Sequence, residues 1–287
     1  MRPEDSSNWT WLGSVAPKDL LEARLQTHYA SQFVAAFGAA YVQRTEDMSH
    51  MGMTWGGKRH AFISGTASGA RMMRMALDLS RFELYALEPG SEFIGVLDRF
   101  NLKDTTFGDA ARWLRKTSAK FGFDPELIKM DFEDLLDHPL AGGGAFTYDG
   151  DEKDMAELGR YFANSNFLLK KICSQISSFS RTYIWSSQLD INVIYATEES
   201  TNRGFTLGMG MSPGDRVMGE PFFYVNRLPI IENIALPDPP ENAQWRQKDW
   251  TGLTLAASQI IRHKTAKEQM EFTEDFLISS AGILNNL

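Results

Sequence analysis

The spacing of apolar positions predicts a long helix near the start of the chain. From Pro17 to Arg44 the apolar residues recur about every four positions, which is typical of an amphipathic helix of about seven turns. His28 and Gln32 lie one turn apart on a single face of this helix. The apolar series comprises Leu21, Leu25, Tyr29, Phe33, Phe37 and Tyr41.

After Thr45 the period shortens towards two, which indicates strands. Gly56-Gly57 separates two such runs and favours a hairpin. Three further runs, RMMRMALDL, RFELYALE and EFIGVLDRF, complete a predicted meander of about four or five antiparallel strands. Thr106 then reads as the N-cap of a second helix, with Asp109 three residues later and Gly122 as a C-cap.

The second half of the chain repeats this order. A helix is predicted from about Asp154 through residue 179, followed by four strand-like runs. Those runs are RTYIWSS, QLDINVIYA, RGFTLGMGM and EPFFYVNRL. After a proline-rich span, the pattern predicts a long helix from about Trp250 to Leu287, with a break near His263-Lys264.

These elements predict an α+β fold, with antiparallel sheets packed against long helices in two similar helix–strands–helix halves. We expect a segment at 1–16, a first half at 17–150 and a second half at 151–287, folded as one compact unit. Residues 123–151, with Pro125, Pro139 and the Gly142–Gly144 run, are predicted to form a surface connection and hinge. The repeated order of helix, strands and helix is explained either by an internal duplication or by the order of elements that α+β proteins often have.

The composition is that of a soluble globular chain, with 43% hydrophobic and 23% charged residues in 287. A net charge of -8 without a dense basic cluster argues against nucleic acid as a partner. The apolar runs reach only about half of the ~20 residues that a membrane span requires, so no membrane partner is expected. A single cysteine, Cys173, and an N-terminus without an export signal favour the cytoplasm.

Histidines come first among the candidate catalytic residues, because imidazole exchanges protons near neutral pH. His28 should point inward from its helix, and His50 opens the first predicted strand. Each is either a catalytic acid or base or a hydrogen-bonded core residue. His60, His138 and His263 are predicted to lie at the surface.

Trp185 and Asp190 lie on either side of a short polar turn, and this hairpin, Arg181–Tyr195, is the candidate site. A carboxylate in a strand of Leu189, Ile191 and Val193 acquires a raised pKa if it is buried, as a general base requires. Alternatively, Asp190 faces solvent or caps the turn. Trp185 is either a core residue or a wall that stacks on a ligand.

No motif for a nucleophile, a phosphate loop or a zinc site occurs, and Cys173 reads as a small buried apolar residue. We therefore expect neither a metal nor an organic cofactor. A metal site assembled from His28, His50 and Asp190 remains an alternative, since ligands can come from separate elements.

The chain also resembles a widespread bacterial family of uncharacterised proteins, over residues from about Leu20 to Asn233. That family has a Tyr-Asp pair, a long helix, a Phe-Phe-Trp-Gly-Ser-Phe-Asp-Leu-Ala type hairpin, a Pro-Gly turn and a Glu-Pro-x-Phe-Tyr strand. The matching positions here are Tyr148-Asp149, the helix through Lys171, Tyr183–Ile191, Ser212–Asp215 and Glu220–Tyr224. In the first half, Thr27-His28 with Gln32 resembles the family's Leu-His-x-x-x-Gln helix, and Ser49-His50 falls where the family has a Trp-Trp-His or Trp-Trp-Asn strand. Two positions depart from the family: Tyr183 replaces a histidine, and the paired tryptophans near His50 are absent. The resemblance implies a shared fold and pocket location, but no reaction.

Three functions follow as hypotheses. The first is an acid/base enzyme that acts on a small molecule, with its pocket between the two halves. Its catalytic residues would be Asp190, His28 and His50, and its substrate-binding residues Gln32, Trp185, Gln188, Tyr224 and Trp55. The second is a binder that uses the same pocket without catalysis. The third is a structural protein with these residues scattered on its surface. The sequence does not indicate the oligomeric state.

Overall fold

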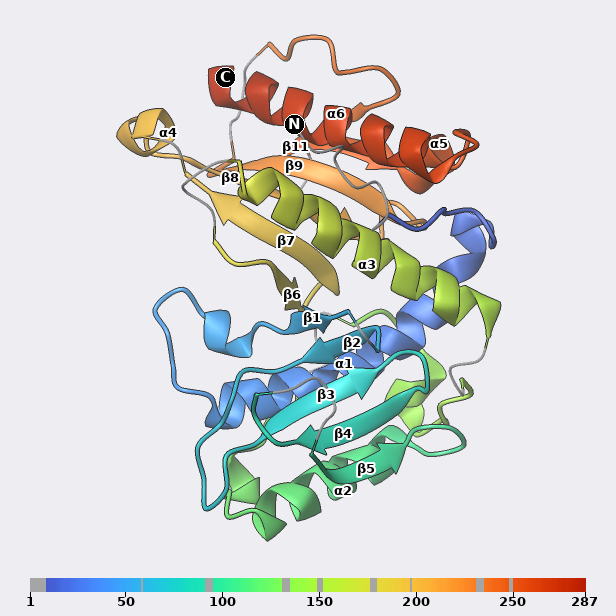
Figure 1. Ribbon diagram of the computed structural model, residues 1–287, viewed down its shortest axis with the longest axis vertical. Coiled ribbons are helices and arrows are strands. Elements are labelled where there is room, and N and C mark those ends of the chain that lie inside the picture. The colour runs from blue at the N-terminus through green and yellow to red at the C-terminus, as the bar shows by residue number, and fades with distance from the viewer. Residues whose placement is uncertain are drawn as a thin grey trace. The chain divides into compact units, whose positions relative to one another are not determined.

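The computed structural model has the predicted α+β architecture, with helices and two antiparallel sheets (Figure 1). The structure describes residues 9–57, 59–90, 95–130, 135–148, 152–175, 180–196, 198–230, 235–247 and 250–287. Asp149 of the family resemblance and residues 176–179 of the predicted second-half helix lie outside these ranges. None of the helices in the described ranges combines the length and apolarity needed to cross a membrane.

The chain forms two compact units, each built from separate stretches of sequence. The first-sheet unit consists of Leu20–Gly159 and Tyr183–Leu189. The second-sheet unit consists of Met1–Asp19, Arg160–Thr182 and Asp190–Leu287. This division differs from the expected split after residue 150, because the hairpin turn before Asp190 groups with the earlier part of the chain.

The first-sheet unit contains the predicted meander. Its five strands follow the order β1-β2-β3-β4-β5. They are β1 (Thr54–Gly56), β2 (Ala61–Ile63), β3 (Arg74–Asp78), β4 (Glu83–Leu87) and β5 (Val96–Asn101). Gly56 pairs with Ala61, which confirms the hairpin predicted from Gly56-Gly57. Residues of the central strands β3 and β4 are almost all buried, whereas the edge strand β5 is largely exposed.

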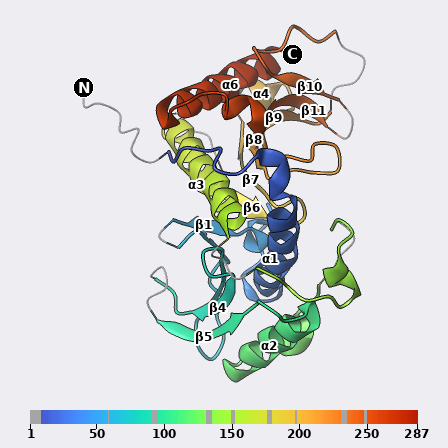
Figure 2. The same ribbon diagram turned by 90° about the vertical axis from the view of Figure 1, so that its right-hand side faces the viewer.

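Helix α1 (Leu21–Tyr41) contacts β2 and β3 of this sheet and follows a 3-10 turn at Pro17–Leu20 (Figure 2). Helix α2 (Phe107–Lys120) contacts α1 and β5. Its start is the predicted one: the Thr106 side chain accepts from the Asp109 backbone N–H, and the Asp109 carboxylate accepts from the Thr106 N–H. This reciprocal pairing satisfies donors that a helix leaves open at its N-terminus.

Short 3-10 turns occupy the connections of the same unit. They are η3 (Ser49–Met51), η4 (Pro125–Leu127) and η5 (Pro139–Gly142). The last two lie in the predicted surface connection. His50 thus lies in a 3-10 turn, not in a strand as predicted, and His60 lies in the β1–β2 loop with a positive φ of 49°.

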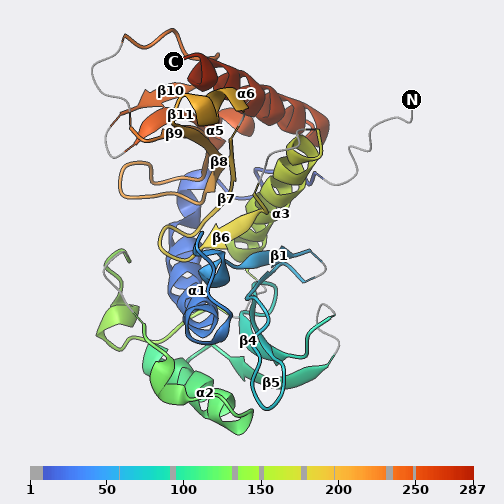
Figure 3. The ribbon, with the colours of Figure 1, turned by 90° about the vertical axis from the view of Figure 1, so that its left-hand side faces the viewer.

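Within the second-sheet unit the strands follow the order β10-β11-β9-β8-β7. They are β7 (Asp190–Tyr195), β8 (Thr206–Ser212), β9 (Phe222–Leu228), β10 (Gln244–Arg246) and β11 (Thr251–Ala256). The short strand β6 (Tyr183–Trp185) belongs to the first-sheet unit. Helix α6 (Ala266–Asn286) contacts β8, β9 and β11 (Figure 3). Two short helices complete the unit, α4 (Glu198–Asn202) and α5 (Ala257–Ile260).

The prediction of a helix beginning near Trp250 is wrong in its first part. Residues Thr251–Ala256 form strand β11, which pairs with β9 on one side and β10 on the other. Its first five residues are all buried, and a short apolar run of this kind does not distinguish a buried strand from a buried helix. The long helix begins only at Ala266, after a capping box formed by Thr265 and Glu268.

Helix α3 (Lys153–Cys173) belongs to both units, because the boundary between them falls at Gly159 and Arg160 within this helix. In the second-sheet unit its Asn164 side chain pairs with both backbone groups of Thr10, at 2.8 and 2.7 Å. Gln269 of α6 pairs in the same way with Leu12, at 2.8 and 2.9 Å. The side-chain amides of Asn164 and Gln269 thus make the backbone hydrogen bonds that a neighbouring strand would otherwise make with the N-terminal segment.

Candidate functional site

A polar cluster lies within the second sheet, where three strands align. Asn192 of β7 is opposite Gly210 of β8, and Gly210 is opposite Tyr224 of β9. A Cβ on Gly210 would lie 2.4 Å from the Ile191 carbonyl oxygen and 3.0 Å from the Tyr224 hydroxyl. The missing side chain therefore lets the tyrosine hydroxyl reach across β8 to β7.

The cluster is closed by its own hydrogen bonds. The Tyr224 hydroxyl donates to Asp190 Oδ2. Asn192 Nδ2 donates to the same carboxylate oxygen at 2.8 Å and to the Tyr224 hydroxyl at 3.1 Å. Asp190 and Tyr224 are buried, with 9% and 8% of their surface exposed. The structure thus joins two of the predicted site residues and adds Asn192, which no sequence pattern singles out.

Burial changes the acid–base properties of both groups. Desolvation raises the pKa of Asp190, although the hydrogen bonds from Tyr224 and Asn192 act in the opposite direction. Desolvation, with the negative charge of Asp190, raises the pKa of Tyr224 well above its ordinary value. Asp190 is therefore a buried carboxyl, as its apolar strand predicts, and it does not face solvent.

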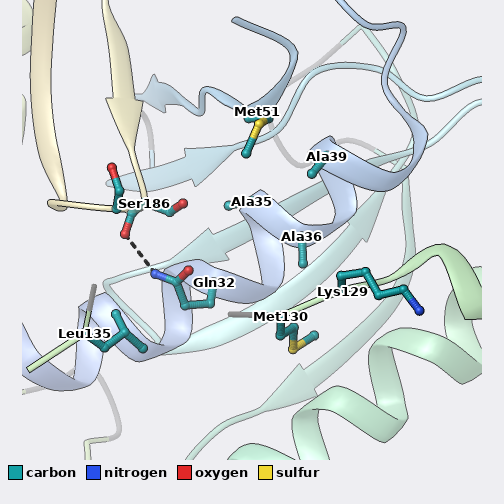
Figure 4. Close-up of a pocket in the computed structure, with 10 residues that line it drawn as sticks. Gln32, Ala35, Ala36, Ala39, Met51, Lys129, Met130, Leu135 and Ser186 are labelled. Carbon is teal, nitrogen blue, oxygen red and sulfur yellow. Dashed lines mark hydrogen bonds between the residues drawn. The ribbon is translucent and has the colours of Figure 1, made fainter. Parts of the chain in front are cut away.

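A cavity of about 230 Å³ lies in the first-sheet unit (Figure 4). One wall is a face of α1, and the others come from η3, the segment after η4 and the turn after β6. The lining is mostly apolar, with polar groups from one glutamine, two serines and one lysine. Its residues are Gln32, Ala35, Ala36, Ala39, Met51, Lys129, Met130, Leu135, Ser186 and Ser187.

Two side chains of α1 hold the turn at one end of the cavity. The Ser186 carbonyl oxygen accepts from Gln32 Nε2 at 2.9 Å and contacts His28 Nε2 at 2.6 Å. Since a carbonyl only accepts, His28 carries a proton on Nε2. His28 and Gln32 thus share one partner, as expected for residues one helical turn apart. In this structure His28 fixes the position of the turn.

His50 and Trp55 occupy separate positions in the same unit. His50 is buried, and its Nδ1 accepts from the Thr45 backbone N–H at 3.3 Å. Trp55 is 7% exposed and stacks with His60 at a ring distance of 5.6 Å. Neither lines the cavity. Both contacts are those of core residues.

The remaining two candidates, Trp185 and Gln188, lie at the turn between β6 and β7. Trp185 is half-buried on β6, 5.8 Å from the ring of Tyr183. Gln188 is exposed in the turn itself. Asp190 and Tyr224 belong to the second-sheet unit, whereas the other predicted residues belong to the first-sheet unit.

Most of the residues that line the cavity could not have been predicted from the sequence. Ala35, Ala36 and Ala39 do follow Gln32 at helical spacing, and such a face of small residues leaves room beside a helix. Met51, Met130 and Leu135 are remote in sequence and reach the cavity only through the tertiary fold.

Metal and thiol chemistry have little support among the side chains that the structure describes. Across those ranges, no three His, Cys, Asp or Glu side chains gather as a metal site requires. Burial raises the pKa of the Cys173 thiol to about 11, so the reactive thiolate is scarce at neutral pH. The metal-dependent alternative stays a prediction that no observation supports.

Comparison with family models, curated proteins and solved structures gave no match to this chain. The resemblance to the uncharacterised bacterial family accordingly stays a prediction.

Proposed function

We propose that this protein binds a small molecule in the cavity beside α1. The observation that carries the proposal is the cavity itself, about 230 Å³ with mainly apolar walls and a few polar groups. Small-molecule sites are usually concave and apolar, with a small number of polar groups that orient the ligand. The volume lies below the ~300–1,000 Å³ common for such sites, which favours a ligand smaller than a nucleotide.

The walls also suit a ligand that arrives from solution. The alanines of α1 present only methyl groups, and Met51 and Met130 have flexible thioether side chains that adapt to different shapes. Gln32 and the two serines supply hydrogen bonds at one end. This proposal requires neither a metal nor an organic cofactor.

Methionine methyl groups give a direct test. We expect small aromatic and aliphatic probes to shift the ¹³C-methyl NMR signals of Met51 and Met130, which line the cavity. The signals of Met48 and Met72, both 52% exposed, should stay unchanged. Ala36→Leu should abolish the shifts by filling the cavity, whereas Ala119→Leu, on the exposed face of α2, should preserve them. Shifts that survive Ala36→Leu, or no shifts at all, would refute the proposal.

Acid/base catalysis is a second candidate, favoured by the cluster around Asp190. A buried carboxyl with a raised pKa, hydrogen-bonded to a tyrosine, is a group that exchanges a proton with a substrate closer to neutral pH. In this version of the proposal, Asp190 is the acid or base and Tyr224 orients it.

Mass spectrometry tests this second candidate separately, because Asp190 and Tyr224 do not line the cavity. The wild type and Asp190→Asn are each incubated with a panel of small molecules, and the products are compared. Product from the wild type alone, with the variant still folded, supports catalysis. Absence of product from the wild type, or equal product from both proteins, removes Asp190 as a catalytic residue.

A further inference from the structure

The orientation of the Gln32 amide is determined by its neighbours. Its Nε2 donates to the carbonyl oxygens of Ser186 at 2.9 Å and of His28 at 3.1 Å. Carbonyl oxygens only accept hydrogen bonds, so the amide nitrogen must occupy this side and the amide oxygen the other. Both donor hydrogens of Gln32 are thereby used.

The Gln32 oxygen is consequently an acceptor beside the cavity. Figure 4 shows the nitrogen directed to Ser186 and the oxygen directed away from it, on the side of Ala35 and Ala36. Among the residues that the structure describes, none donates a hydrogen bond to this oxygen. A molecule in the cavity would meet a fixed acceptor at this end.

Apart from the hydroxyl groups of Ser186 and Ser187, the rest of the lining offers little that would hold a charge at this end. The next residues along this face of α1 are Ala35, Ala36 and Ala39, which have only methyl groups. Lys129 lines the cavity with its stem, while its nitrogen points away from Gln32 (Figure 4). A carboxylate next to Gln32 would put an anion against the amide oxygen, an arrangement with two acceptors and no proton.

We infer that the ligand is a small, neutral, largely apolar molecule with one hydroxyl or N–H group, which donates to Gln32 Oε1. This inference rests on the proposed binding function and specifies its chemical class. Indole and phenol have this form: each pairs a flat apolar body with a single donor. Their methylated forms, 1-methylindole and anisole, keep the body but lack the donor.

Binding of these four probes, followed at the Met51 and Met130 methyl signals, tests the inference. We expect indole and phenol to bind about tenfold more tightly than their methylated forms, the effect of one hydrogen bond of about 1.4 kcal/mol. Equal binding of donor and methylated probes would overturn the donor inference while leaving the binding function intact. If none of the probes shifts either methyl signal, the binding function itself fails.

Two variants assign the preference to Gln32. In Gln32→Met, which has similar length and no acceptor oxygen, the preference for indole should disappear while 1-methylindole still binds. The control is Gln188→Met. Gln188 lies in the turn that contains Ser186, but it is exposed and does not line the cavity, so this variant should retain the preference. A preference that persists in a folded Gln32→Met would overturn the assignment. Should that variant fail to fold, the four-probe comparison in the wild type still decides the donor inference.

Discussion

The polar cluster of the second sheet and the cavity of the first-sheet unit show opposite ways of using polar groups. In the cluster, Asp190, Asn192 and Tyr224 bond to one another, and Gly210 is needed for them to fit. In the cavity, the Gln32 oxygen lies on the side of Ala35 and Ala36 and accepts no hydrogen bond from a residue that the structure describes. The ionisable side chains of the cluster are tightly packed against one another, whereas the cavity is lined mainly by neutral groups, with Lys129 as the exception. This contrast is why we favour a binder over an enzyme.

Gly210→Ala should have the largest effect and would show how tightly the cluster is packed. A methyl group there would meet the Ile191 carbonyl at 2.4 Å, so backbone must move. We expect a loss of about 3 kcal/mol in the free energy of unfolding, measured with urea. The matched control is Gly219→Ala, where no atom of the described residues, its two chain neighbours aside, lies within 4 Å of the new methyl group. A similarly small change in both variants would mean that the cluster is loosely packed.

Tyr224→Phe removes one member of the cluster without changing its shape. Asp190 would lose a donor, and Asn192 an acceptor, inside a buried site. Leaving buried partners unsatisfied costs about 1–3 kcal/mol, which denaturant unfolding should detect. Tyr85→Phe serves as the control. Tyr85 is also buried, but the acceptor of its hydroxyl, Glu83, is only half-buried, so its loss of a partner should cost less. If Tyr224→Phe were as stable as the wild type, the hydrogen bonds of the cluster would not contribute to the stability of the sheet.

Sequence patterns predicted much of the fold because they are local. The α1 periodicity, the Thr106 capping box and the meander are each encoded within a few turns or strands. Thr251–Ala256 was assigned to a helix because its strand character depends on β9 and β10 beside it, which no local pattern contains.

The same distinction between local patterns and tertiary contacts applies to the candidate sites. The apolar strand around Asp190 predicts a buried carboxyl, and its partner Tyr224 is also among the candidate residues. Their direct contact depends on the register across Gly210, which the sequence does not reveal. Gln32 was predicted from its spacing to His28, but the cavity beside it depends on Met130 and Leu135, which lie about a hundred residues further along the chain.

Asp190→Asn should produce a pH-dependent gain in stability. Because the pKa of Asp190 is higher in the folded protein than its ordinary value of 3.8, the folded state holds the proton more strongly. That contribution is complete below about pH 3.8 and is lost as pH rises through the raised pKa. The amide variant should therefore gain on the wild type across this window, by about 1.4 kcal/mol per unit of pKa difference. Parallel unfolding curves from pH 3 to 8 would contradict the raised pKa.

Ala36→Leu should have the smallest effect on stability and tests the other side of the comparison. If the cavity is open in solution, the larger side chain enters it and buries new apolar surface. The free energy of unfolding should then change little, or rise by about 1 kcal/mol, as is common when cavities are filled. Ala30→Leu is the matched control on the same helix, since Ala30 is fully buried and does not line the cavity. That variant must displace packed neighbours, and it should lose about 1–3 kcal/mol. Equal losses in the two variants would mean that the space beside Ala36 is as tightly packed as the polar cluster, and the contrast on which the binding function rests would disappear.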